Sequence, residues 1–194
     1  LLAGADIVIE SSGTEVMKSL GLDYETVSQV NPSLIYLSIS AFGCDGPKAK
    51  WASTDLTILA SGGQMVLTGD SDRAPLRIPL PQAYLHASSE GAAAILIALY
   101  ERQRHSGLGQ HIDVSAQAST LQASQTYMVA SAINAPEFTR AAGGVTLSGI
   151  DLQLMWPCSD GYVSVTLLFG PALGPFTRNL FEWIFEEGFC DEET

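Results

Sequence analysis

The sequence is poor in positive charge and in long apolar runs. It has 9 Lys and Arg against 21 Asp and Glu, which gives a formal net charge of −12 over 194 residues. This balance argues against non-specific binding to nucleic acid or to an anionic membrane surface, because both need a basic face. The longest apolar run, residues 92–100, is far shorter than the roughly 20 residues that span a bilayer. We therefore expect neither nucleic acid nor a membrane among the partners.

Cysteine is also scarce, and its placement is informative. The three cysteines, Cys44, Cys158 and Cys190, are far apart and form no CxxC pair. This usage is typical of a reducing compartment and excludes a disulfide framework, so we predict a cytoplasmic protein. The three histidines form no HExxH or HxxxH pattern, so we predict no metal site. The nucleotide-binding patterns GxGxxG and GxxxxGK[ST] are missing as well.

The N-terminal two thirds alternate between strand and helix patterns. A β-branched run at residues 5–10 is followed by helical spacing over 15–20 and 24–30, and then by a buried strand at 34–39. A short helix is expected at 54–62, a long one at 84–104, a strand at 110–114 and a further helix at 115–133. Strand–helix–strand order predicts an α/β fold with a parallel sheet.

The C-terminal third has a different pattern. A Gly-rich loop over 140–150 precedes two expected strands, 152–156 and 162–167, which flank the turn at Ser159, Asp160 and Gly161. An amphipathic helix is expected at 175–187. We predict a large domain over 1–135 and the start of a smaller α+β domain over 136–194. A strand starts almost at residue 1 without an initiator Met or a leader-like stretch, so we also expect an internal fragment of a longer chain.

Two loops are candidates for binding an anionic ligand. The loop at 41–53 follows the carboxyl end of a strand, where open α/β sheets bind ligands, and it carries Lys48 and Lys50. Gly143 and Gly144, with Arg140, can close over a phosphate through backbone N–H groups. The alternatives are a surface turn with solvated lysines for the first loop, and a simple hairpin connection for the second.

Two side chains at expected helix starts have similar alternatives. Asp55 is placed where a carboxylate caps a helix and is favoured by its dipole, and capping alone can explain it. Tyr84 lies at the start of the long helix, where a phenol can bind a ligand or can simply pack as an amphipathic side chain. At this level the residues indicate an α/β enzyme or binding domain.

Longer motifs resemble the family III CoA-transferases, also called the CaiB/BaiF group. The stretch APLRIPLPQAYLHASSEGAAAILIALYERQRHSGLGQHIDVS at residues 74–115 resembles the family's PLR-x-x-x-P-x-A-D segment, its small-residue helix and its G-x-G-Q-x-(I/V)-D-V-S turn. Upstream, ADIVIE, NPSLIYLSISAFGCDGP and TDLTILASGG resemble the family's ADVVIENF, NPRLIYVSISGFGxxGP and YDLxxQAxSG blocks. Together these blocks span residues 1 to about 120, and residues 156–167 resemble a later family hairpin.

The resemblance implies an architecture and a reaction. Family members have a Rossmann-like large domain and a smaller domain, and two chains interlock as a dimer. They move CoA between an acyl-CoA thioester and a free carboxylic acid, with CoA as a substrate and no permanently bound cofactor. The family nucleophile is an Asp that forms a mixed anhydride and then an enzyme-linked CoA thioester.

The sequence departs from the family at this nucleophile. Aligning Pro81-Gln82-Ala83 with the family's P-x-A places Tyr84 at the Asp position, and a phenol is largely protonated near pH 7. Three interpretations follow. The chain is a non-catalytic subunit that pairs with an Asp-bearing paralogue, or it uses another carboxylate such as Glu90 or Asp55, or it binds acyl-CoA without transferring it. The partner is accordingly a second copy or a paralogue.

The CoA-contacting segment also departs from the family. The family's ENF turn reads Glu10-Ser11-Ser12 here, and Lys18 is the nearest cation after it. Thr54 stands where the racemase branch of the family has a His, which disfavours racemisation. The residues that the resemblance and the loop patterns assign to CoA binding are Ser11, Ser12, Lys18, Lys48, Arg77, Gly143 and Gly144.

Overall fold

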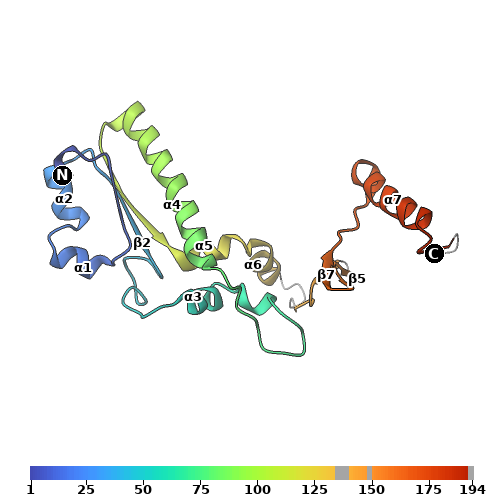
Figure 1. Cartoon of the computed structure of the whole chain (residues 1–194). Helices are drawn as coiled ribbons and strands as arrows, with labels where there is room; N and C mark the ends of the chain where they lie inside the picture. The colour runs from blue at the N-terminus through green and yellow to red at the C-terminus, as the bar shows by residue number, and fades with distance from the viewer. Residues whose placement is uncertain (134–139, 148–149, 192–194) are drawn as a thin grey trace. The chain divides into compact units, whose positions relative to one another are not determined.

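The computed structural model describes residues 1–133, 140–147 and 150–191. The chain divides into two compact units, Leu1–Arg140 and Ala141–Thr194 (Figure 1). The division predicted from sequence after residue 135 falls just before this boundary, and it remains a prediction about the domains of the whole protein.

The first unit is built on a three-stranded parallel sheet, as the strand–helix alternation predicts. Its strands are β1 (Ile7–Glu10), β2 (Ile35–Ser40) and β3 (His111–Ser115), in the order β1-β2-β3. Ile7 pairs with Ile35, and Tyr36 pairs with His111. All three strands point the same way, so their carboxyl ends meet at one edge of the sheet, the edge where open α/β sheets bind ligands.

Two short helices connect β1 to β2: α1 (Thr14–Ser19) and α2 (Tyr24–Val30). Asp23 caps α2 because its side chain accepts a hydrogen bond from the Thr26 N–H at 3.1 Å. The helix ends at Asn31, whose side-chain amide donates to the carbonyl of Ala5 at 2.9 Å. This bond fastens the crossover to the start of β1.

The second crossover, from β2 to β3, is longer. It contains α3 (Asp55–Ser61), the 3-10 turn η2 (Met65–Leu67) and α4 (Gln82–Glu101), which continues as one π-helical turn, η3 (Arg102–Ser106). The chain reverses at Gly107, which adopts a left-handed conformation at φ 70°. Arg102 donates from Nη1 to the carbonyl of Ser33 at 2.7 Å and thereby ties the end of α4 to the start of β2.

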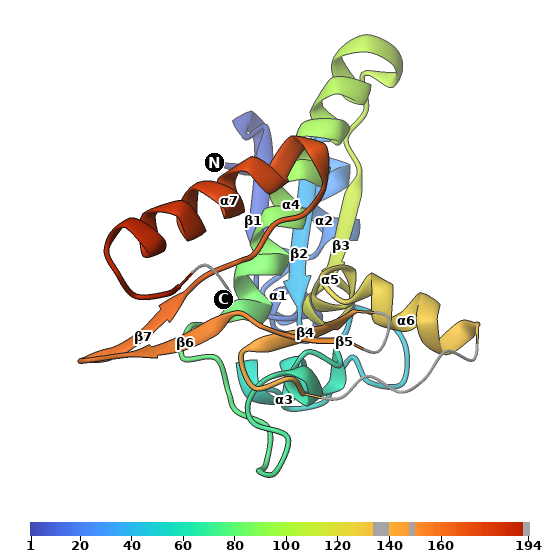
Figure 2. The same cartoon turned by 90° about the vertical axis from the view of Figure 1, so that its right-hand side faces the viewer.

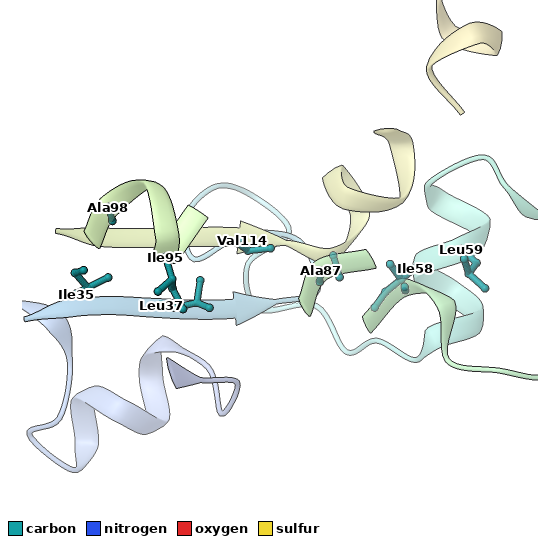
Figure 3. Packing of buried hydrophobic residues seen from close by; sticks show 10 residues of the cluster. Ile35, Leu37, Ile58, Leu59, Ala87, Ile95, Ala98 and Val114 are labelled. Atoms are coloured by element: carbon teal, nitrogen blue, oxygen red, sulfur yellow. The ribbon is translucent and has the colours of Figure 1, made fainter. Parts of the chain in front are cut away.

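Apolar side chains pack on both faces of the sheet. On the α4 face, Leu37 and Val114 belong to one buried cluster with Ile95 of α4 (Figure 3). On the opposite face, Tyr36 packs with Val27 of α2. Alternate residues of β2 therefore point to opposite layers, as strand geometry requires, and Figure 1 shows α4 on the other side of the sheet from α1 and α2.

The single helix predicted for 115–133 is wrong in detail. The structure has two helices, α5 (Ala116–Gln122) and α6 (Gln125–Ala132). Ser124 is buried between them, and its hydroxyl donates to the carbonyls of Gly62 and Thr120 at 3.4 Å. A Ser side chain that bonds backbone carbonyls competes with regular helical bonding, which explains the break.

The second unit contains two antiparallel hairpins and a helix (Figure 2). Strands β4 (Gly144–Leu147) and β5 (Ile150–Gln153) form one hairpin, and β6 (Met155–Cys158) and β7 (Gly161–Ser164) form the other. Helix α7 (Gly170–Glu186) follows. These elements correct the predicted loop at 140–150, because Gly144 begins a strand and pairs with Gln153.

The predicted boundaries of the last elements also change. The strand expected over 152–156 is divided between β5 and β6, because the Gly143 carbonyl accepts both the Leu154 and the Met155 N–H groups at 3.0 Å. Helix α7 begins at Gly170, earlier than the predicted residue 175. Pro171 lies in its first turn, where a backbone N–H would have no acceptor within the helix, so a proline is tolerated there. In the ranges that the structure describes, no helix is both long and apolar enough to cross a membrane.

Candidate functional site

Asp55 joins the starts of α3 and α4. Thr54 caps α3 and forms a capping box with Thr57, which leaves the Asp55 carboxylate free to point elsewhere. Its Oδ1 accepts the Ala83 N–H at 3.0 Å, so Asp55 caps α4 from a distant position in the chain. Pro81, at the N-cap of α4, contributes no side-chain cap of its own. Asp55 is 8% exposed and therefore lies beneath the start of α4.

The first turn of α4 leaves one backbone donor free. A helix start presents N–H groups without intrahelical partners. Pro81 has no N–H, and the Gln82 N–H donates to the Leu80 carbonyl at 2.8 Å. The Ala83 N–H is bonded as described. Within the described part of the chain the Tyr84 N–H has no hydrogen-bond acceptor, and it lies at the positive end of the helix dipole.

Arg77 approaches the same place from the preceding loop. Its Nε lies 3.7 Å from Asp55 Oδ2, and its side chain is 49% exposed. Asp55 Oδ2 is fully buried and has no hydrogen-bond partner among the described residues. Arg77 and Asp55 thus form a loose ion pair with one buried member. Tyr84, which follows Ala83 in the chain, is 39% exposed.

The structure does not bring Glu90 to this site. Glu90 Oε2 accepts a hydrogen bond from the hydroxyl of Ser119, a buried residue of α5. The contact joins α4 to α5 further along the helix. No hydrogen bond among the described residues links Tyr84 to Asp55 or to Glu90. Each carboxylate proposed as a substitute nucleophile therefore has a visible structural contact, and their catalytic roles remain predictions.

The segment predicted to contact CoA lies after β1. Glu10 is buried, and its Oε2 accepts the N–H groups of Ser12 at 2.8 Å and Gly13 at 3.2 Å. Ser11 and Ser12 are exposed, and so is Lys18 in the last turn of α1. The structure shows these groups as accessible and leaves their assignment to CoA as a prediction.

A cavity of about 100 Å³ lies beside this segment, on the α1 and α2 face of the sheet. Its lining is acidic, with no Lys or Arg among the described residues that line it (Glu10, Thr14, Met17, Asp23, Tyr24, Glu25, Tyr36, Ser38, Cys44, Asp45 and His111). Burial, followed by the charges of Glu10 and Asp23, raises the pKa of Tyr36 to about 12. Such a lining disfavours phosphate, so this cavity is not where the structure offers an anion site.

The loop after β2 has one hydrogen bond to the sheet and one internal cation–π contact. The Cys44 N–H donates to Asp113 Oδ2 of β3 at 2.8 Å. Lys48 Nζ lies 5.5 Å from the ring centroid of Trp51, in a cation–π arrangement. Burial raises the pKa of the Cys44 thiol, which favours its neutral form. Lys48 thus already has an aromatic partner, and its contact with CoA stays a prediction.

Arg140 has a structural use that its sequence context did not reveal. Its guanidinium donates to three backbone carbonyls, those of Asp70 at 2.9 Å, Val66 at 3.1 Å and Arg73 at 2.8 Å. This geometry contradicts the idea that Arg140 meets a phosphate, because most of its donors are engaged. No sequence signal identifies such a clamp, since its acceptors are main-chain atoms.

The predicted glycine pair has its own local role. Gly143 adopts φ 84°, in the left-handed region that only glycine enters easily. A Cβ there would come within 2.7 Å of Met155. Gly144 begins β4, as described. Their contact with CoA remains a prediction. Among the described residues, no group of His, Cys, Asp and Glu is arranged to hold a metal ion.

The fold and this helix start define an α/β protein with a candidate ligand site at the first turn of a long crossover helix. Residues 1–181 match the family model described as CoA-transferase family III. The chain belongs to this family, as the sequence motifs indicate.

Individual relatives are named as members of the same family or as CoA-transferases. The chain is 35% identical to "Succinyl-CoA:(R)-benzylsuccinate CoA-transferase subunit BbsE" of Thauera aromatica, over 97% of this chain and 44% of that protein. It is 38% identical to "Succinate--glutarate CoA-transferase" of Agrobacterium fabrum, over 59% of this chain and 28% of that protein. A CAIB/BAIF family protein from Brucella suis superimposes with a TM-score of 0.74 at 34% identity, covering 83% of this chain and 42% of that one. The chain thus spans less than half the length of these relatives.

Proposed function

We propose that the whole protein is one subunit of a CoA-transferase that moves CoA between an acyl-CoA thioester and a free carboxylic acid. In this proposal the nucleophilic carboxylate comes from a second, Asp-bearing subunit, and Tyr84 takes no covalent part. CoA and acyl-CoA are substrates and not resident cofactors.

The observation that carries this proposal is the environment of Tyr84. In this proposal Tyr84, at the start of α4, takes the place of the family's Asp, and the two carboxylates proposed as substitutes are otherwise engaged. Asp55 is buried and bonded to the Ala83 N–H, and Glu90 is bonded to Ser119. The relative that matches almost the whole chain is itself named as a subunit, which supports a hetero-oligomer.

The chemistry explains why a carboxylate is needed. A carboxylate oxygen attacks the thioester carbonyl, the C–S bond breaks, and CoA leaves as a thiolate, which gives a mixed anhydride. The thiolate then attacks the enzyme's own carbonyl, which forms an enzyme–CoA thioester and releases the first acid. The acceptor acid repeats these steps in reverse. A phenol would give an aryl ester instead, which does not continue this sequence.

The remaining features of the proposal come from the family. We propose a Rossmann-like large domain completed by parts outside this chain, an interlocked dimer with a paralogue, and a cytoplasmic location. The parallel sheet and its crossover helices support the first of these features.

Steady-state transfer assays with the full-length protein test the proposal. The protein alone should not transfer CoA, and adding the Asp-bearing paralogue should give transfer. Tyr84→Phe should leave the rate of the mixed complex unchanged, because the hydroxyl takes no part. Efficient transfer by the full-length protein alone would contradict the proposal.

A gain-of-function variant provides the complementary control. Tyr84→Asp places a carboxylate at the proposed nucleophile position, at the positive end of α4. If the rest of the site is intact, this variant should transfer CoA without the paralogue. The matched control is Tyr84→Asn, which has nearly the same size and no charge, and which should stay inactive alone.

A further inference from the structure

We propose that the cavity on the α1 and α2 face of the sheet binds a small organic cation, an alkylammonium ion, through Glu10 and a wall of aromatic rings. The cavity lies on the face opposite α4, and no step of the proposed CoA transfer needs it. The inference therefore goes beyond the proposed function.

The cavity collects negative charge without a balancing cation. Four carboxylates line it, those of Glu10, Asp23, Glu25 and Asp45, and no Lys or Arg is among its described lining residues. Within the described ranges, none of the four takes part in an ion pair. Burial first, and then the charges of Glu10 and Asp23, raise the pKa of Tyr36. The local potential is therefore negative, and it attracts a cation.

Glu10 gives a second, independent indication of a ligand. It is 8% exposed, and its Oε2 accepts the N–H groups of Ser12 and Gly13. Its other oxygen, Oε1, accepts no hydrogen bond from the residues that the structure describes, although it is not enclosed as Asp55 Oδ2 is. A nine-tenths buried carboxylate with an unpaired oxygen is unfavourable, and an ammonium N–H bonded to that oxygen removes the cost.

Three aromatic rings form one wall of the cavity. Tyr24 stacks on His111 with the ring centroids 5.0 Å apart, and Tyr36 meets His111 edge-on at 5.5 Å. The rings come from α2, β3 and β2, and all three line the cavity. Aromatic rings attract a cation and also pack against its alkyl groups. Such a wall suits an organic cation better than a hydrated inorganic one.

The size of the cavity and its donor set narrow the class of cation. Its volume of about 100 Å³ suits a short-chain molecule and not a nucleotide. Among the described residues, no group of His, Cys, Asp and Glu is arranged to hold a metal ion. A short alkylammonium fits both conditions, because its N–H groups can bond Glu10 while its chain packs on the rings.

Calorimetric titration of the full-length protein with propylammonium chloride tests the inference. The neutral control ligand is 1-propanol and the inorganic one is potassium chloride. Wild-type protein should bind propylammonium and give no binding heat with either control. Glu10→Gln should weaken the binding about 10-fold or more, because the charge is lost. Its amide oxygen can still accept the Ser12 and Gly13 N–H groups, so the turn should be kept.

Glu15→Gln is the matched control variant. Glu15 lies on α1, pairs with Lys50 at the surface and is not part of the cavity lining, so this variant should bind propylammonium as the wild type does. Asp45→Asn changes an exposed lining residue and should weaken binding about 2- to 5-fold. Thermal unfolding identifies any variant that fails to fold. If Glu10→Gln fails, Asp45→Asn decides, and unchanged binding there overturns the inference.

Absence of propylammonium binding in the wild type would overturn the inference, and so would equal binding by the wild type and a folded Glu10→Gln. Equal heat with potassium chloride would show that the cavity only collects counterions. Displacement of propylammonium by free CoA would assign the cavity to the CoA segment and would also overturn the inference. Because the titrations need no turnover, Glu10-dependent binding supports the inference even if the paired complex fails to transfer CoA.

Discussion

Asp55 Oδ1 accepts the backbone N–H of Ala83 at 3.0 Å, across a sequence separation of 28 residues. Through this bond, the first residue of α3 caps the first turn of α4. The same carboxylate attracts Arg77. One buried side chain therefore contacts both the first turn of α4, next to Tyr84, and the Arg77 guanidinium.

Replacing Asp55 by Ala should destabilise the first unit by about 1–3 kcal/mol, because the Ala83 N–H loses its partner in a buried place. Asp55→Asn should lose less, since its amide oxygen can still accept that N–H. Denaturant unfolding measures both. Glu15→Ala, which removes an exposed ion pair with Lys50, should change stability by less than about 1 kcal/mol. Equal losses for Asp55→Ala and Glu15→Ala would argue against the cap.

Replacing Gly91 by Ala tests the packing of α4 on β2. A Cβ at this position would lie 2.9 Å from Leu37 Cδ2, so the helix must move or Leu37 must change rotamer. We expect a net loss of about 1–3 kcal/mol, although Ala has the better helix propensity. Ser89→Ala, at an exposed site on the same helix, should be neutral or slightly stabilising. A more stable Gly91→Ala protein would contradict the close approach of α4.

Arg140→Lys should loosen the loop that precedes Arg77. A lysine ammonium cannot reach the three carbonyls that the guanidinium bonds. Limited trypsin digestion, followed by mass spectrometry, should show faster cleavage after Arg73 in this variant. Arg178→Lys, an exposed substitution on α7, should cleave there at the wild-type rate. If both variants behave alike, Arg140 does not hold the loop.

The raised pKa of Tyr36 predicts that the folded chain loses stability at alkaline pH. Its pKa is raised to about 12 in the folded chain, from about 10 in an unfolded one. The folded state therefore holds this proton more tightly, so the contribution is fully present below pH 10 and is lost as the pH rises toward 12. Tyr36→Phe should be less stable at neutral pH, because it loses the bond to the Leu22 carbonyl, and should show a smaller decline over that interval.

Tyr162→Phe is the control for this titration. Tyr162 lies on β7 and is 74% exposed, so its removal should leave the alkaline decline in place. Unfolding free energies measured from pH 8 to pH 12 compare the three proteins. An identical decline in Tyr36→Phe and the wild type would show that Tyr36 does not carry the effect.

Much of the first unit could be predicted from local patterns. The β-branched residues of β1 and β2, and the long run of small and apolar residues in α4, specify their elements with little help from the rest of the chain. The break before Ser124 could not be predicted, because it depends on the carbonyl of Gly62 in another element. The strand at Gly144 was missed because glycines weaken strand signals, and pairing with Gln153 supplies what they lack.

For the candidate site, too, single residues could be predicted from the sequence, but their contacts with one another could not. Tyr84 and Asp55 could each be singled out, since both lie at helix starts, and the alignment of Tyr84 with the family's Asp stays a prediction. Their shared environment could not be derived, because it depends on a backbone N–H of Ala83 and on the direction of the Arg77 side chain. Contacts made by main-chain atoms cannot be predicted from the types of residues in a sequence. For the same reason the sequence analysis assigned Arg140 to a phosphate, whereas its guanidinium bonds backbone carbonyls.

We propose that this chain carries no nucleophile of its own, and trapping the covalent intermediate is the sharpest test of that proposal. The full-length protein and its Asp-bearing paralogue are mixed with acyl-CoA, quenched, separated and weighed by intact mass spectrometry. We expect a covalent CoA or acyl adduct on the paralogue and none on this protein. An adduct on this protein that maps to the peptide containing Tyr84, Asp55 or Glu90 would contradict it.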